Sequence, residues 1–310
     1  MTIVQYSSDF SRVFIKNIQY LYKMAGPDVI PFIRYSLIGI GDFSHGDNNI
    51  WHYRLDLLKR VMIETKNRIT IFIEDLDEHT DNIKLDETLI IGDSYGVAAG
   101  KFPYGPLERY CYRAWDSPIY LKIIKYVRKH QNRINIIGVD VPRQARDKAM
   151  ARNILKNLNV KHINFFWAAN SHVDARRITE SYELKFVPNE KYRTGFYLKK
   201  RLKHKYCIVL STGYQGEVRF SSACNNSDCD IRTFFEIPIF EKFKHEQYSK
   251  WVGVSDKRYM LYKKNEFNED LVEFADAKFP EDPFVTKSRT WDYLLFFSKV
   301  YRLNLIMRNS

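Results

Sequence analysis

Short apolar runs rich in β-branched and aromatic residues recur along the chain, and this recurrence most limits the folds available to it. The five clearest runs are Tyr35 to Ile40, Ile69 to Ile73, Ile134 to Val139, Ile163 to Ala168 and Tyr206 to Leu210. The stretches between them are mostly helix-like. Because strands that alternate with helices form parallel sheets covered by helices, the sequence predicts an α/β fold with a mainly parallel sheet flanked by helices.

The first linking stretch shows the helical pattern most clearly. Asp47 can cap its start, and apolar residues follow at helical spacing: Ile50, Tyr53, Leu57, Leu58, Val61 and Met62. Helices are also predicted over residues 119–127 and 145–158. Residues 231–239 are typical of a further strand, and the apolar tail over residues 291–300 fits a strand or a helix.

The segment over residues 75–117 departs from this alternation, because glycine and proline interrupt it repeatedly and aromatic residues are interspersed. Such a composition favours a loop that covers a binding site. At 310 residues and 45% hydrophobic, the chain can bury a large core. We therefore expect one domain over residues 1–310, with residues 75–117 forming a lid-like insertion after the second strand.

No apolar run approaches the roughly 18 residues that indicate a membrane span, and no signal-peptide pattern opens the chain. The cysteines are too few and scattered for a disulfide framework, which predicts reduced thiols at Cys111, Cys207, Cys224 and Cys229. We expect a soluble cytoplasmic protein with no membrane partner.

A formal net charge of +12 raises the question of an anionic partner. The densest basic stretch, over residues 199–205, precedes an apolar run, where a solvated helix end explains it better than a nucleic-acid patch does. The sequence also lacks an RNA-binding aromatic signature and zinc-finger spacing. We therefore expect no nucleic-acid partner.

Polar residues follow each predicted strand, where ligands bind in open parallel sheets. They are Asp42, Ser44 and His45; Glu74, Asp75 and Asp77; Asp140; Asn170 and His172; Ser211 and Thr212. Asp140 and Ser211 can equally be helix caps or turn formers. The sequence thus predicts a site at the carboxyl edge of the sheet.

His45 and Glu74 are the most informative of these residues. His45 ends a glycine-rich loop near the start of the following helix, whose dipole disfavours imidazolium and keeps a base available. Glu74 ends an apolar strand, where burial of its carboxylate requires a partner. Arg54, on the helix after His45, is the partner that the sequence suggests.

The sequence lacks the signatures of dinucleotide binding, serine hydrolysis and zinc binding. Gly39 and Gly41 are not followed by the third glycine of a dinucleotide fingerprint, and no Gly-x-Ser-x-Gly elbow is present. Cys224 and Cys229 have no second pair with zinc-site spacing. We therefore expect no cofactor.

The segment Ile38-Gly-Ile-Gly-Asp-Phe-Ser-His-Gly46 resembles the Gly-Glu-x-Thr/Ser-His-Gly signature of erythromycin esterase-like proteins. The resemblance continues in order along the chain through Arg54, Ile73-Glu74, Trp115, Gly138-Val-Asp140, Arg146-Asp147-Lys-Ala-Met-Ala-Arg-Asn153, Trp167-Ala-Ala-Asn170-Ser-His172 and Trp291-Asp292. This collinearity is more specific than any single motif.

The resemblance implies hydrolysis of an ester, a macrolide lactone in characterised members, by water activated in a cleft without a tightly held metal. The implied catalytic residues are His45 as general base, Glu74 and Asp42 to orient the base or the water, Arg54 to fix a carboxylate or stabilise negative charge, and His172 to bind the carbonyl oxygen or return a proton. We assign Ser44, Trp115 and Asn170 to substrate binding.

This chain departs from the family where Asp42 replaces the usual Glu and where the insertion after Glu74 is short. We expect a small-molecule ester or lactone as substrate. A binding or regulatory protein without turnover is one alternative. Another is a metal-dependent hydrolase that binds zinc or manganese through Asp42, His45, Glu74 and His172.

Overall fold

A seven-stranded sheet forms the centre of the molecule, in the order β3-β2-β4-β1-β5-β11-β8. The computed structural model describes residues 30–43, 47–74, 117–141, 146–177, 191–213, 217–219, 234–236, 259–264, 272–276, 284–288, 290–297 and 300–301. The strands of this sheet are β1 (Leu37–Asp42), β2 (Ile69–Ile73), β3 (Ile134–Gly138), β4 (Ile163–Ala169), β5 (Tyr206–Gly213), β8 (Met260–Lys263) and β11 (Tyr293–Phe297). All are parallel except β8, which pairs antiparallel with β11.

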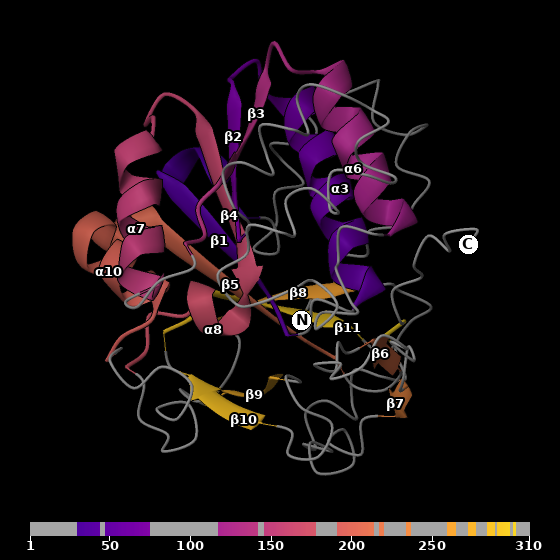
Figure 1. Ribbon diagram of the computed structural model, residues 1–310, viewed down its shortest axis with the longest axis vertical. Coiled ribbons are helices and arrows are strands. Elements are labelled where there is room, and N and C mark those ends of the chain that lie inside the picture. Colours follow the sequence, from indigo (N-terminus) through magenta and orange to yellow (C-terminus); the bar gives the residue numbers. More distant parts are fainter. Residues whose placement is uncertain are drawn as a thin grey trace, which may run out of the picture.

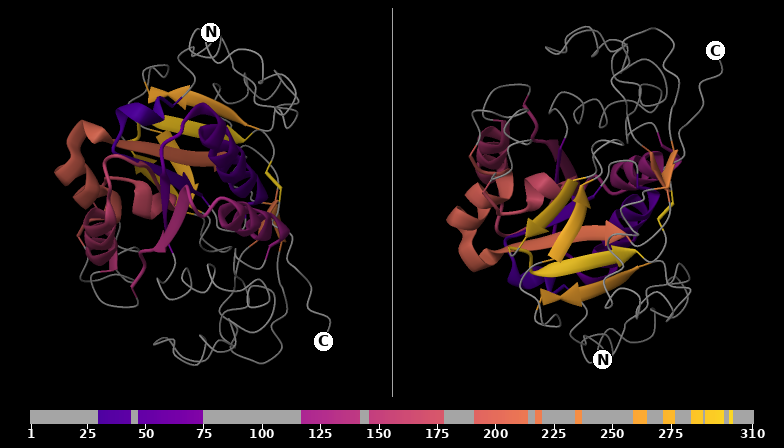
Figure 2. Two further views of the ribbon diagram at one scale, coloured as in Figure 1. Left: turned by 90° about the horizontal axis from the view of Figure 1, so that it is seen from above. Right: turned by 90° about the horizontal axis from the view of Figure 1, so that it is seen from below.

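Helices cover both faces of the sheet (Figure 1), and the views in Figure 2 show the same two layers. One face carries α3 (Asn48–Glu64) and α6 (Pro118–Lys129), and the other carries α7 (Arg146–Asn157) and α10 (Thr194–Leu202). Shorter elements are η2 (Phe32–Arg34), α8 (Asn170–Val173) and η5 (Lys203–Lys205), with the strand pairs β6 (Glu217–Arg219) and β7 (Phe234–Glu236), and β9 (Val272–Asp276) and β10 (Phe284–Ser288). The predicted parallel α/β fold is confirmed.

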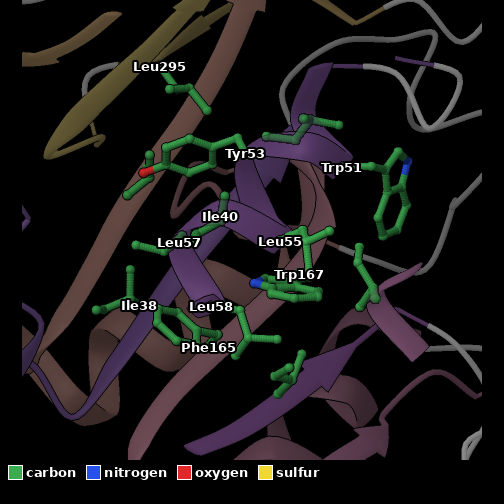
Figure 3. Packing of buried hydrophobic residues seen from close by; sticks show 14 of the residues in the cluster. Ile38, Ile40, Trp51, Tyr53, Leu55, Leu57, Leu58, Phe165, Trp167 and Leu295 are labelled. Atoms are coloured by element: carbon green, nitrogen blue, oxygen red, sulfur yellow. The ribbon is translucent and has the colours of Figure 1, made fainter. Parts of the chain in front are cut away.

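The core forms on both faces because nearly every side chain of the inner strands is buried. On one face Leu55 and Leu58 of α3 pack with Ile40 and Trp167 of the sheet (Figure 3). Burying a side chain such as Leu58 completely contributes about 1.5–3 kcal/mol. The second cluster, under α7 and α10, includes Met150, Ile154, Phe166 and Leu198.

Each of the five apolar runs forms a strand, and the predicted helices are present. Asp47 caps α3 by accepting a hydrogen bond from the Asn49 N–H at 2.7 Å. The tail contains β11, and β7 lies within residues 231–239. The predicted lid lies outside the described residues, except that Ser117 caps α6.

Two glycines of β1 allow α8 to pack closely against the sheet. A Cβ atom at Gly39 would lie 2.5 Å from the Tyr206 hydroxyl and 2.7 Å from Val173 Cγ1. One at Gly41 would lie 2.9 Å from the Asn170 Cα. The Gly-x-Gly pattern therefore serves close packing of the segment that carries His172.

No helix in the described ranges combines the length and the apolar character needed to cross a membrane. Cys207, in β5, is buried with a free thiol. The other three cysteines lie outside the residues that the structure describes.

Candidate active site

His172 lies in α8, directly after β4, where a buried carboxylate fixes its ring. Its Nδ1 is 2.7 Å from Asp147 Oδ1 in the first turn of α7. The same oxygen accepts hydrogen bonds from the Thr194 N–H at 2.8 Å and the Thr194 hydroxyl at 2.6 Å. Arg193 donates to the other Asp147 oxygen at 3.4 Å. Asp147 is therefore held by two neighbouring residues and in turn orients the imidazole.

Glu74 follows β2 and lies on the other side of the same ring. Its Oε1 is 3.2 Å from His172 Nε2 and 2.8 Å from an Arg146 guanidinium nitrogen. Its Oε2 accepts a hydrogen bond from the Ala169 N–H at 2.8 Å. Asp140, after β3, also accepts from Arg146, at 2.6 and 2.5 Å. The contacts of Glu74 with His172, Arg146 and the Ala169 N–H satisfy its carboxylate, which would otherwise be costly to bury.

The two carboxylates decide the charge of His172. Burial lowers the pKa of the imidazole, but Asp147 and Glu74 outweigh this effect and raise its pKa to about 9. His172 is therefore protonated at neutral pH, with Nε2–H directed at Glu74. Arg146 also lies 3.2 Å from Nε2, so that it can donate to the ring once the proton has left. The ring thus has a partner for Nε2 in both protonation states, as suits a proton donor.

A second buried ion pair joins Asp42 and Arg54 at 2.8 Å. The same Arg54 nitrogen donates to the carbonyl oxygens of Ile40 at 2.8 Å and Ala168 at 3.2 Å, which link β1 to β4. Burial lowers the pKa of Arg54, and the adjacent Asp42 opposes this effect.

Two indole rings lie beside the Arg54 guanidinium. Its central carbon is 4.6 Å from the ring centroid of Trp51 and 5.6 Å from that of Trp167. Such cation–π contacts stabilise a desolvated arginine. Both charged side chains of the pair are 1% exposed, so they are shielded from solvent within the layer between α3 and the sheet.

Asn170 connects the ends of three strands. Its amide nitrogen donates to the Ser211 carbonyl oxygen at 2.7 Å, and its amide oxygen accepts from the Ser211 N–H at 3.0 Å. The Ser211 hydroxyl in turn accepts from the Phe43 N–H at 3.1 Å. Asn170 thereby fixes the end of β4 against β5 and the exit from β1.

Asp42, Glu74, Asn170 and His172 all lie at the carboxyl edge of the parallel strands, as the sequence indicated. The expected pairing of Glu74 with Arg54 was wrong, because Arg54 forms its ion pair with Asp42 and Glu74 with Arg146. The electrostatic field of Glu74 still reaches Arg54. Three predicted site residues, Ser44, His45 and Trp115, lie outside the described residues.

Sequence reasoning missed the supporting groups around His172. Asp140 was left open as a cap, and Arg146 and Asp147 entered only as part of the family resemblance. A signal was nevertheless present, because a helix that follows a strand begins at the same edge at which the strand ends. Charged residues in the first turn of α7 could therefore have been added to the candidate site.

Within the ranges that the structure describes, no group of three or more His, Cys, Asp or Glu side chains could hold a metal ion. The metal-dependent alternative includes His45, which lies outside those ranges.

The fold is shared with three solved structures. A Bacillus cereus protein is 12% identical with a TM-score of 0.55, and the alignment covers 94% of this chain and 93% of that chain. A succinoglycan biosynthesis protein is 12% identical with a TM-score of 0.62, and 98% and 96% of the two chains are covered. A mutant of the erythromycin esterase EreC, in its open conformation, is 10% identical with a TM-score of 0.58, with coverage of 93% and 95%.

Among curated protein sequences none matches this chain. The family model described as erythromycin esterase matches residues 142–235, which include Asp147, His172 and Thr194. Residues 142–235 are therefore similar in sequence to the erythromycin esterase family, and the whole chain shares its fold with an erythromycin esterase.

Proposed function

We propose that the chain hydrolyses a small carboxylic ester or lactone. The observation that carries this proposal is His172, which is buried between Asp147 and Glu74 and protonated at neutral pH. A fixed cationic donor at the carboxyl edge suits a reaction in which negative charge develops on oxygen. The match of residues 142–235 to the erythromycin esterase family model supports the same class of chemistry.

In the proposed reaction His45 takes a proton from water, and the water oxygen bonds to the carbonyl carbon. The carbonyl π electrons move onto oxygen and form a tetrahedral oxyanion. The carbon–oxygen single bond then breaks, and the proton on His172 Nε2 passes to the departing alkoxide. Arg146 lies within hydrogen-bond distance of His172 Nε2 and can donate to the neutral ring. His45 then releases its proton to solvent and His172 takes up a proton from solvent, which returns both residues to their starting protonation states.

Asp42 and Arg54 support the site in this proposal rather than contacting the substrate. Both side chains are almost fully shielded, and Arg54 uses one nitrogen to hold β1 and β4 together. Asp42 is shorter than the Glu usual in the family, yet it contacts Arg54 directly at 2.8 Å. The substitution therefore preserves an ion pair that fixes the strand ends.

The test is a panel of esters and lactones assayed with the wild type and with His45→Ala and His172→Gln. Loss of a positioned general base typically costs about 10² to 10⁴ in rate, and we expect a loss of that order for His45→Ala. His204→Ala serves as the control, because His204 is exposed in η5 at the opposite edge of the sheet.

Thermal unfolding of each variant separates lost chemistry from lost structure. A His45→Ala protein with full activity would overturn the assigned base, and elemental analysis would then test for a metal-bound water. No turnover of any ester by the wild type would favour a binding protein on the same fold.

A further inference from the structure

At the amino edge of the sheet, opposite the candidate site, the described connections lie side by side. The connections that lead into neighbouring strands are hydrogen-bonded to each other there. The Ser36 N–H donates to the Lys205 carbonyl oxygen at 2.9 Å, and the Ile163 N–H donates to the Arg68 carbonyl oxygen at 2.9 Å. Asn164 donates its side-chain amide to the Ser36 carbonyl oxygen at 3.0 Å. Five strands, from β3 to β5, spaced about 4.8 Å apart, make this edge roughly 20 Å across.

This edge is strongly basic. Exposed lysine and arginine residues on its connections and adjoining helix ends are Arg34, Lys66, Arg68, Lys129, Lys156, Lys161, Lys200, Arg201, Lys203 and Lys205. The acidic residues in the described connections, Glu64 and Asp292, are ion-paired with Arg60 and Lys199. Among the described residues, the positive charge of the edge is therefore not cancelled by neighbouring acidic side chains.

The helix dipole accounts for only part of this charge. Helices that cover a parallel sheet end at its amino edge, where lysine and arginine in the last turn are favoured. Lys129, Lys156 and Arg201 occupy such positions. Lys66 and Lys161 instead lie in loops beyond the helix ends, where the helix dipole does not account for them.

Exposed aliphatic side chains lie among these charges. Ile33 in η2 is 64% exposed, Ile63 in the last turn of α3 is 63% exposed, and Val160 before β4 is 73% exposed. The other large hydrophobic residue exposed in the described part is Tyr301, at 52%. Single exposed hydrophobics are ordinary, but all three aliphatic ones gather at the basic edge.

We propose that this edge docks on the surface of a membrane rich in anionic lipid. Its lysine and arginine side chains would contact headgroup phosphates, while Ile33, Ile63 and Val160 enter the interface between headgroups and acyl chains. A nucleic acid would match the positive charge but would give the aliphatic side chains no role. This proposal replaces the expectation from the sequence that the protein has no membrane partner. Docking of this kind needs no membrane-spanning segment, and it leaves the candidate site at the far edge facing the aqueous phase.

The experiment is co-sedimentation of the full chain with lipid vesicles. We expect binding to phosphatidylcholine vesicles that contain about 30 mol% phosphatidylserine and little binding to pure phosphatidylcholine. Raising the salt from about 0.1 M to about 0.5 M should weaken binding by screening. Each neutralised basic residue should cost about fivefold, so the quadruple change Lys66→Gln, Arg68→Gln, Lys161→Gln and Lys205→Gln should weaken binding at least about a hundredfold.

A matched control removes the same charge from the exposed faces of α6 and α7, through Lys122→Gln, Lys125→Gln, Lys148→Gln and Arg152→Gln. This control should keep most of the binding. Circular dichroism and thermal unfolding establish that both quadruple variants are folded. Equal losses in the two variants would mean that only net charge matters, and would overturn the assigned surface.

The aliphatic side chains distinguish a membrane from a nucleic acid. The triple change Ile33→Ser, Ile63→Ser and Val160→Ser keeps every charge and should weaken vesicle binding at least about tenfold. Failure of the wild-type protein to bind anionic vesicles would overturn the proposal. The proposal would also be overturned if the protein bound a DNA or RNA duplex tightly and the triple change weakened neither duplex binding nor vesicle binding.

Discussion

Replacing Asp147 with Asn tests whether a buried carboxylate holds the proton on His172. The pKa of His172 is raised from 6.5 to about 9, a difference that corresponds to about 3 kcal/mol of favourable interaction with the protonated ring. The His172 side chain is only 4% exposed, so solvent screens this interaction little. Asn keeps the shape and can still accept hydrogen bonds from Thr194, but it removes the negative charge.

The sign of the effect on stability follows from the raised pKa. A histidine whose folded pKa exceeds its unfolded value stabilises the fold fully below pH 6.5 and loses this contribution as the pH rises through about 9. In Asp147→Asn the pKa of His172 should fall by about 1 or more. The loss of stability between these pH values should shrink by at least about 1 kcal/mol.

Two measurements check this prediction. NMR titration of the imidazole proton, assigned by its absence in His172→Gln, gives the pKa of His172, and urea unfolding across the same pH range gives the stability. Asp140→Asn is the control, because Asp140 bonds to Arg146 rather than to the imidazole. An unchanged pKa of His172 in folded Asp147→Asn would refute the reasoning.

Two further substitutions test the framework beneath the site. Arg54→Met leaves Asp42 as a buried carboxylate without its cation and should lower the free energy of unfolding in urea by about 3–5 kcal/mol; a loss below about 1 kcal/mol would contradict the buried pair. Gly41→Ala places a methyl group 2.9 Å from the Asn170 Cα and should cost about 1–3 kcal/mol in the same assay, whereas an unchanged midpoint would show that α8 does not pack closely on β1.

The fold could be predicted from the sequence because its strands are short, fully buried and bounded by polar residues. Residues 69–73 form β2 as predicted, and Asp47 caps α3 because its carboxylate reaches the second N–H of the helix. The tail over residues 291–300 was ambiguous, since a short apolar run fits either a strand or a helix. Pairing with β5 and β8 makes it a strand, and that tertiary contact is not visible in local sequence.

The candidate site could be predicted only in part. The rule that polar residues after parallel strands meet at one edge placed Glu74 and His172 correctly. It could not assign their partners, because these depend on strand order. With the order β3-β2-β4-β1, Glu74 lies beside the end of β3 and pairs with Arg146 at the start of α7, whereas Asp42 pairs with Arg54 of α3. Both acids and both arginines were visible in the sequence, but their pairing was not.

The most direct test of the proposed chemistry is the pH dependence of kcat/KM for the best substrate of the ester panel. If protonated His172 acts as the donor, activity should fall with rising pH along a limb near the pKa of about 9. In Asp147→Asn this limb should move to lower pH, in step with the pKa measured by NMR. A wild-type profile that stays flat through this range, or a limb that does not move in Asp147→Asn, would contradict the role of His172.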